Sequence, residues 1–185
     1  MPLILETERL IIRDIELQDF PFLLKRKISR KDRPNILYQK SDTIHDEEEL
    51  KSCFQWAYYR YQREYYQLVV FQKSNLTFIG TCGIWDVSPD NTAMIGWHFE
   101  NKYSGNGYAT ESAQEPLYIG FELNRVAAIS ADCFEENLAS IRIMEKLGMS
   151  PDWSIGSAKK LNGNGDNKPI VRHRILRKEW LNLHG

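Results

Sequence analysis

The sequence predicts an α/β fold in which a mixed, mostly antiparallel sheet is flanked by helices. Three strand-like runs, rich in aromatic and β-branched residues, occupy positions 66–73, 77–87 and 92–100. The connections between them are short turn sequences, so these strands are expected to form an antiparallel meander. A helix, a strand, a second helix and a last strand follow, and this alternation places helices on the faces of one sheet.

The residues before the meander carry weaker signals. Residues 10–14 alternate loosely and lead into an apolar stretch, which indicates a strand followed by a helix through about residue 27. Residues 26–40 are basic and contain Pro34, so a loop or a broken helix is expected there. Residues 46–62 begin with acidic side chains and place apolar side chains on one face, which is the pattern of a long helix.

The residues after the meander give clearer patterns. Helices are expected at 108–122 and 137–147, and strands at 125–133 and 170–177. The Asn- and Gly-rich segment 161–167 is expected to be an exposed turn. Because no repeat and no linker interrupts the chain, residues 1–185 are expected to form a single domain.

Composition and charge exclude several classes of function. The 185 residues, 42% of them hydrophobic and 26% charged, are typical of one soluble globular domain. The net charge of -1 and the absence of a dense basic run argue against a nucleic-acid partner. No apolar stretch approaches ~20 residues and the first residues lack the pattern of a secretory signal, so we expect no membrane association and a cytoplasmic location.

The cysteines and histidines predict neither disulfides nor a metal site. Cys53, Cys82 and Cys133 are odd in number and widely separated, which favours reduced thiols that behave as small buried hydrophobes. The four histidines are far apart, and neither Cys-x-x-Cys nor His-x-x-x-His spacing occurs. No bound metal is therefore expected.

The strongest local signal is the run N-K-Y-S-G-N-G-Y-A-T-E at residues 101–111. Gly105 and Gly107 lack Cβ atoms, so the backbone can turn sharply and let several N–H groups converge on an anion. The following helix adds the positive end of its dipole, which attracts phosphate. No lysine follows Gly107, as a Walker loop requires, and Thr110 stands where a Rossmann fingerprint has its third glycine. Alone, the pattern leaves open a phosphate-binding loop and an ordinary glycine turn.

A second segment, residues 137–149, has the signature of a short amphipathic helix. Its apolar side chains recur at helical spacing. Asn137 is a natural N-cap, because its side-chain oxygen can accept a hydrogen bond from the first turn. Gly148 suits the left-handed position that follows a last helical turn.

Together the two segments resemble the GNAT superfamily of acetyl-CoA-dependent N-acetyltransferases. The matching patterns are K-x-x-G-x-G followed by Y-A-T-E at 102–111, and N-x-x-S followed by E-K-L-G-M at 137–149. A third match is the opening L-E-T-E-R-L-I-I-R at residues 5–13. This opening and the Y-A-T-E run are most similar to the RimJ/RimL branch, the ribosomal-protein N-terminal acetyltransferases. The matches lie in family order over nearly the whole chain.

The resemblance implies a GNAT acyltransferase fold with about six or seven strands flanked by helices. It also implies direct acetyl transfer from acetyl-CoA to an amine. In GNAT proteins the strand before the phosphate loop splays from its neighbour, and its exposed N–H groups bind the pantetheine and the acetyl carbonyl. By this resemblance the residues expected to contact the cofactor are Trp97, His98, Phe99, Lys102, Tyr103, Ser104, Gly105, Asn106, Gly107, Tyr108, Ala109, Thr110, Asn137 and Ser140.

The proton donor is expected to be Ser140. Many family members carry a tyrosine seven residues after the capping asparagine, but Met144 stands there and has no proton to give. Ser140 lies three residues after Asn137, where the RimJ/RimL branch also has serine, and its hydroxyl could protonate the leaving thiolate. The alternative is a serine that bonds the backbone of its own helix.

The general base stays open. Met94 occupies the position of a glutamate that is frequent in the family, so the candidates are His98, Glu100 and His173. An imidazole with a pKa of about 6.5 can take a proton near neutrality. Structural roles for both histidines and a water-assisted reaction are equally compatible with the sequence, because an α-amino group with a pKa of ~8 is already partly neutral.

The acceptor is expected to be an amine. The RimJ/RimL resemblance suggests a protein N-terminus, and a small-molecule amine such as an antibiotic or a polyamine is the alternative. Met94 and Met144 stand where many family members carry a glutamate and a tyrosine. Their presence suggests a third hypothesis from another class, a non-catalytic acyl-CoA-binding sensor. A monomer and a homodimer are both compatible with the sequence.

Overall fold

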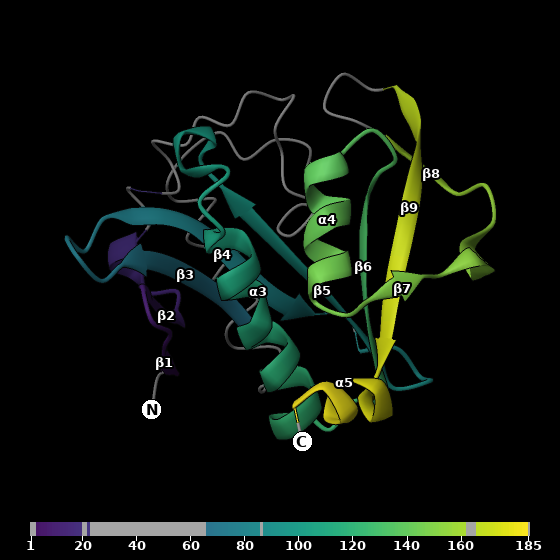
Figure 1. The fold of residues 1–185 in the computed structure, drawn as a ribbon, viewed down its shortest axis with the longest axis horizontal. Helices are drawn as coiled ribbons and strands as arrows, with labels where there is room; N and C mark the ends of the chain where they lie inside the picture. Colours follow the sequence, from purple (N-terminus) through teal and green to yellow (C-terminus); the bar gives the residue numbers. More distant parts are fainter. Residues whose placement is uncertain (1–2, 20–21, 23–65, 86, 162–165, 185) are drawn as a thin grey trace.

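The described residues up to Phe99 form an antiparallel meander (Figure 1). The computed structural model describes residues 3–19, 22, 66–85, 87–161 and 166–184. Its first five strands pair in chain order: β1 (Ile4–Glu6), β2 (Leu10–Asp14), β3 (Tyr66–Gln72), β4 (Phe78–Trp85) and β5 (Thr92–Phe99). Each neighbouring pair is antiparallel, which confirms the predicted meander.

The C-terminal half continues the same sheet with a change of direction. Strand β6 (Ala128–Phe134) pairs in parallel with β5, and β9 (Asn167–Leu176) pairs antiparallel with β6. Two short strands, β7 (Ser150–Pro151) and β8 (Lys159–Leu161), both pair with β9. The described residues thus form nine strands where about six or seven were expected. The additional strands β1, β7 and β8 are too short to show a periodic pattern of their own.

Two helices lie in front of one face of the sheet. Figure 1 shows α3 (Tyr108–Tyr118) and α4 (Leu138–Lys146) on that face, with α5 (Arg177–His184) beside the C-terminal end of α3. The sequence did not predict α5. Helix α5 follows β9 without an intervening turn. The Leu176 N–H donates to the Glu179 carboxylate at 2.8 Å, and this hydrogen bond caps the start of the helix.

The predicted helix at 108–122 is confirmed, but its last turn is wider than an α-helix. Residues Ile119–Leu123 form a π-helical turn closed by the Asn124 N–H, which donates to the Ile119 carbonyl at 2.9 Å. A Cβ at Gly120 would lie 2.6 Å from Ile84 and from Ile129, so glycine lets this turn rest directly on the sheet. The next strand begins at Ala128 rather than at 125, because Arg125 adopts a left-handed turn with φ of 54°.

The main core lies between the sheet and helices α3 and α4. Its fully buried side chains come from six strands and both helices, and include Leu10, Ile12, Leu68, Ile84, Ala93, Ile129, Leu117, Met144 and Ile175. Every residue of β4 is buried, which makes β4 a central strand covered on both faces. Cys82 and Cys133 are buried free thiols, as predicted, and burial raises the pKa of Cys133 to about 11.

Several predictions fall on residues outside the described ones. These are Cys53, the segments 26–40 and 46–62, and most of the helix expected through residue 27, of which the short 3-10 turn Leu17–Asp19 is described. The turn expected at 161–167 is described at its two ends. Among the described residues, no helix is long and apolar enough to span a bilayer, and no group of three potential ligands is arranged to hold a metal ion.

Candidate active site

The sheet opens between β5 and β6. The two strands share three residue pairs, from Thr92 with Ala128 to Met94 with Ser130. Beyond that point β5 stays beside β4 as far as Phe99, whereas β6 stays beside β9 as far as Phe134. Each strand follows its outer neighbour, so β5 and β6 diverge toward their C-terminal ends (Figure 1).

Backbone donors of β5 point into this divergence. In an antiparallel pair, the N–H and C=O of one residue face the partner strand and those of the next residue face away. The Glu100 N–H donates to the Ile79 carbonyl of β4 at 3.2 Å, so the even-numbered residues of β5 face β4. The N–H groups of Trp97 and Phe99 therefore point toward β6, beyond the last residue pair that the two strands share. Oriented donors in such a position can bind the carbonyl groups of an extended ligand.

A glycine loop follows β5 directly. One turn of 3-10 helix (η3, Asn101–Tyr103) leads into the loop, where Gly105 and Gly107 both have φ of 80°. This left-handed conformation is open to glycine because it lacks a Cβ, and it produces the sharp turn that was expected here. Gly107 occupies the N-cap position of α3 and has no side chain to bond the first-turn N–H groups. These N–H groups and the helix dipole form a position suited to an anion.

Side-chain donors hold the loop carbonyls away from that position. The Asn106 Nδ2 donates to the carbonyls of Tyr103 and Ser104, both at 3.2 Å. The Arg9 Nη1 donates to the Asn106 carbonyl at 3.0 Å. Because a trans peptide unit is planar, the N–H on its other side points the opposite way. The N–H groups of Gly105 and Gly107 are thus directed away from these side chains, as an anion cradle requires.

The first turn of helix α4 carries the hydroxyl of Ser140. The Asn137 Oδ1 accepts a hydrogen bond from the Ser140 N–H at 3.1 Å, which confirms Asn137 as the helix cap. The half-buried Ser140 hydroxyl makes no hydrogen bond to any described residue. The alternative in which Ser140 bonds its own helix backbone is therefore not observed within the described part of the chain.

Comparison with known proteins settles the family. Residues 9–150 match the model of the Acetyltransferase (GNAT) domain, which covers most of the chain. The chain belongs to the GNAT acetyltransferase family. A relative with an N-acetyltransferase name is the uncharacterized N-acetyltransferase YnaD of Bacillus subtilis (strain 168). It is 29% identical over 175 residues, which cover 94% of this chain and 97% of YnaD.

Solved GNAT structures share the fold over almost the full length. Mutant forms of the spermidine/spermine N-acetyltransferase SpeG from Vibrio cholerae superpose with a TM-score of 0.79 at 17% identity, covering 97% of this chain and 100% of SpeG. The ribosomal-protein-S5-alanine acetyltransferase from Vibrio fischeri gives a TM-score of 0.77 at 19% identity, with coverage of 96% and 98%. The protein is thus an N-acetyltransferase with the GNAT fold, and GNAT enzymes take acetyl-CoA as donor.

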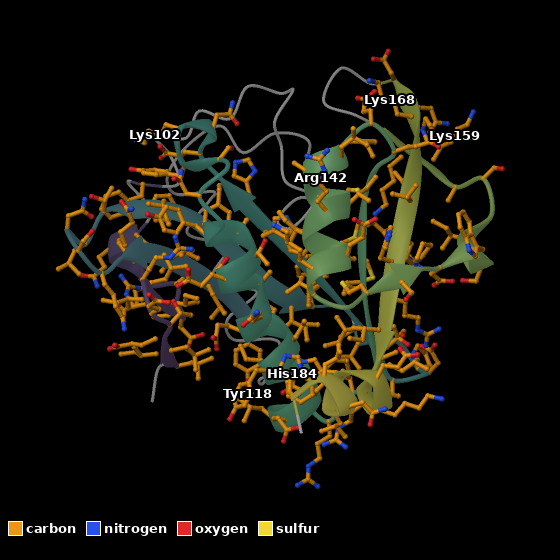
Figure 2. The ribbon with its side chains drawn as sticks, viewed as in Figure 1. Lys102, Tyr118, Arg142, Lys159, Lys168 and His184 are labelled. Atoms are coloured by element: carbon orange, nitrogen blue, oxygen red, sulfur yellow. The ribbon has the colours of Figure 1, made fainter. Side chains whose placement is uncertain are left out.

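The predicted cofactor residue Lys102 pairs with a base candidate. Its Nζ lies 2.9 Å from the Glu100 carboxylate and 4.9 Å from the centre of the Tyr103 ring. The hydrogen bond that Lys102 donates to the Glu100 carboxylate raises the pKa of Lys102. Figure 2 shows Lys102 at the end of the molecule where η3 leads into the glycine loop. Glu100, which the sequence offered as a base, already neutralises a cation.

The two candidate histidines of this GNAT domain lie on opposite faces of the sheet. Trp97 and Phe99 pack against the main core, so His98 between them points to the other face. His173 of β9 lies opposite Ala131 on the core face and is 4% exposed. Its Nδ1 has no hydrogen-bond partner among the described residues, and burial lowers the pKa of His173. The fold does not bring the two imidazoles together.

Met144 is a core residue rather than part of the site. Its side chain is fully buried between α4 and the sheet. This is the position at which many family members carry a tyrosine, and the sequence already predicted that no proton donor stands there. The Ser140 hydroxyl is consequently the protic side chain that α4 offers close to its N-terminus.

The sequence missed the residues that hold the loop from outside. Thr7 and Arg9 bond Glu111 in the first turn of α3, and Arg9 also bonds the loop itself. The pattern T-E-R at residues 7–9 was visible as a family match, but its partners are about a hundred positions away. Spacing along the chain could not reveal the contact.

A hollow elsewhere on the molecule is separate from this site. It has a volume of about 380 Å³ and is lined by Leu5, Gln114, Glu115, Tyr118, Trp180 and His184. Figure 2 shows Tyr118 and His184 at the end of the molecule opposite Lys102. Burial raises the pKa of Glu115. The hollow lies beside the C-terminal part of α3, whereas the glycine loop precedes the N-terminus of that helix.

Proposed function

We propose that this N-acetyltransferase binds acetyl-CoA along the divergence of β5 and β6 and transfers its acetyl group directly to a primary amine. The observation that carries the proposal is the order of donors along the chain. The Trp97 and Phe99 N–H groups come first, and the loop at Gly105 and Gly107 follows immediately. Acetyl-CoA presents a thioester, then amide carbonyls, then a diphosphate, so its groups meet donors in the matching order.

The proposed reaction needs two proton transfers. The amine nitrogen attacks the thioester carbonyl carbon, and a β5 N–H group stabilises the resulting oxyanion, a contribution of ~3–4 kcal/mol in such sites. The carbon–sulfur bond then breaks, and the sulfur takes the proton of the Ser140 hydroxyl. Water carries the proton lost by the amine nitrogen back to Ser140, so that free thiol and amide leave the enzyme with all protons accounted for.

Water fits the role of proton acceptor better than two of the named side chains. Glu100 is paired with Lys102, which weakens it as a base. His173 is buried on the core face and has no exposed edge to reach an amine. His98 keeps its place as the candidate side-chain base, because it lies on β5 next to the proposed thioester donors.

We propose a protein N-terminal amine as the acceptor. The opening at residues 5–13 and the Y-A-T-E run resemble the RimJ/RimL branch, and the ribosomal-protein-S5-alanine acetyltransferase shares the fold with a TM-score of 0.77. SpeG, whose name specifies spermidine and spermine, shares the fold equally well with a TM-score of 0.79. A polyamine is therefore the second acceptor class.

Thiol release from acetyl-CoA tests the proposal. The purified protein is mixed with acetyl-CoA and one of three acceptors: a peptide that begins with a free alanine, the same peptide with a blocked N-terminus, or spermidine. We expect release with the free peptide and none with the blocked one. Release with spermidine alone would transfer the assignment to polyamines. Calorimetry that detects no binding of acetyl-CoA or free CoA would refute the proposed cofactor site.

A further inference from the structure

The start of the chain is bonded to the phosphate loop across about a hundred residues. Glu111, in the first turn of α3, accepts hydrogen bonds from the Thr7 hydroxyl and from the Arg9 backbone N–H at 3.0 Å. Its second oxygen accepts from the Arg9 Nε at 2.7 Å and lies 2.6 Å from the Arg9 Nη2. Arg9 therefore pairs with the carboxylate through two nitrogens of its planar guanidinium group.

The same guanidinium reaches the loop. Its Nη1 donates to the Asn106 carbonyl at 3.0 Å, and a Cβ at Gly107 would lie 3.4 Å from its Nη2. One rigid fork thus spans the first turn of α3 and the peptide unit between Asn106 and Gly107. Lysine carries a compact point charge and cannot reproduce this planar fork.

The Arg9 guanidinium group also stacks over the ring of Tyr108. The Arg9 guanidinium carbon lies 4.6 Å from the centre of the Tyr108 ring, within the range of a cation–π contact. The Tyr108 hydroxyl in turn accepts a hydrogen bond from the Gln72 Nε2 at 2.8 Å, which ties the first residue of α3 to the end of β3. Contacts with Glu111, the Asn106 carbonyl and the Tyr108 ring therefore fix the position of the Arg9 guanidinium group.

Taken together, these contacts point to a role in cofactor binding. We propose that Arg9 is a positioning residue for the diphosphate of acetyl-CoA, an inference that rests on the proposed function. Arg9 holds the Asn106 carbonyl turned outward, which directs the Gly107 N–H of the same peptide unit into the anion position. It also neutralises Glu111, whose carboxylate would otherwise repel a diphosphate at the start of α3.

The proposal predicts an effect on one part of the cofactor only. Without Arg9, the Asn106–Gly107 peptide unit loses the donor that orients it and the Glu111 charge is uncompensated. Both changes weaken binding of the diphosphate, while the β5 donors and Ser140 keep their places. The acetyl end of the cofactor should therefore react as before once the cofactor is bound.

Two acetyl donors separate these effects. We compare kcat/KM for acetyl-CoA with kcat/KM for S-acetylpantetheine, which has the same thioester and amides but no diphosphate. In the Arg9→Ala variant the preference for acetyl-CoA should fall by about tenfold or more. The loss should appear in the KM for acetyl-CoA, with kcat and the use of S-acetylpantetheine retained. Arg9→Lys, which keeps the charge, should give an intermediate preference.

Arg13→Ala is the matched control. Arg13 lies four positions further on, and its guanidinium pairs with Asp19 through two hydrogen bonds of 2.7 Å, away from the loop. Its loss should destabilise the protein and leave the donor preference unchanged. The preference is a ratio measured on one protein sample, so a smaller folded fraction does not alter it. Should Arg9→Ala fail to fold, Arg9→Lys decides the question by the same ratio.

The outcomes distinguish the inference from the proposed function. If the Arg9 variants lose activity equally with both donors, Arg9 has a purely structural role and the inference is wrong. If the unsubstituted protein itself shows no preference for acetyl-CoA over S-acetylpantetheine, the loop does not bind a diphosphate and the proposed cofactor site is wrong.

Discussion

Ser140 carries the side-chain chemistry of the proposed reaction. Its backbone N–H is fixed by the Asn137 cap at 3.1 Å, so the first turn of α4 holds the residue in place. Its hydroxyl makes no hydrogen bond to a described residue and remains available to a ligand. Because the half-exposed hydroxyl has no partner among the described residues, a ligand can bond it without breaking a hydrogen bond of the fold.

Replacement of Ser140 should affect turnover and leave folding intact. For Ser140→Ala we expect kcat to fall by about a hundredfold, because the thiolate must leave without a general acid. The KM for acetyl-CoA and the melting temperature should change little, since the hydroxyl bonds no described residue. Steady-state kinetics and a thermal melt check both points. Ser140→Cys, which restores a protic group, is the control, and unchanged turnover in Ser140→Ala would remove the serine from the mechanism.

Two glycines of β4 allow its neighbours to approach closely on either side. A Cβ at Gly80 would lie 2.5 Å from the His98 carbonyl of β5, and a Cβ at Gly83 would lie 2.4 Å from the Tyr66 carbonyl of β3. Glycine inside a strand often marks a bulge or a close approach of a neighbouring backbone. Both occur, because the register between β3 and β4 also shifts between Val70 and Phe71, close to Gly80.

Substitution of Gly80 or of Gly83 by alanine should create a similar steric clash, but only the Gly80 variant should affect cofactor binding. Gly80→Ala should cost about 1–3 kcal/mol of stability and displace β5, which carries the proposed thioester donors. The KM for acetyl-CoA should therefore rise roughly tenfold. Gly83→Ala should be destabilised to a similar degree through β3, with the KM unchanged. Chemical denaturation and kinetics measure both quantities, and an equal rise of the KM in the two variants would show that β5 has no special role.

The stability of the whole molecule depends on a buried imidazole that lies under α4. His173 is 4% exposed, its Nδ1 has no hydrogen-bond partner among the described residues, and burial lowers its pKa from the ordinary 6.5. The unfolded chain therefore takes up this proton at a higher pH than the native protein does. Native stability must fall as the pH drops below about 6.5, and the fall ends at the lower pKa of the folded state.

Replacement of His173 with an apolar ring should remove this dependence. At pH 7 we expect His173→Phe to stabilise the fold by about 1 kcal/mol, because an unsatisfied buried nitrogen is lost. Between pH 6.5 and 5 its stability curve should be flatter than that of the parent protein. Burial alone would raise the pKa of Glu111 and of Asp132. Hydrogen bonds from Thr7 and Arg9 to Glu111, and from Arg172 and Lys160 to Asp132, outweigh burial and lower both pKa values, so these carboxyl groups titrate only at more acidic pH.

Denaturant unfolding at a series of pH values provides the measurement. Turnover of His173→Phe should stay close to that of the parent protein, because the imidazole is buried on the core face. A large loss of kcat with unchanged stability would instead restore His173 as a catalytic base.

Much of the candidate site could be predicted from local patterns. The sharp turn at Gly105 and Gly107, the Asn137 cap and the left-handed Gly148 are all found as expected. Each of these features depends on residues within one turn of one another, and backbone conformation at such short range is strongly constrained by residue type. The three strands of the meander are long enough to show a strand pattern and were predicted from the sequence. Strand β7 has two residues, too few to show such a pattern, and was not predicted.

By itself the sequence indicated the family, the order of strands and helices around the loop, and the glycine pattern of the loop itself. The tertiary structure alone decided where β5 and β6 part, on which face each histidine lies, and that Arg9 holds a loop about a hundred residues away. These features arise from pairing between distant segments, and such pairing leaves no periodic trace in the residues of either partner.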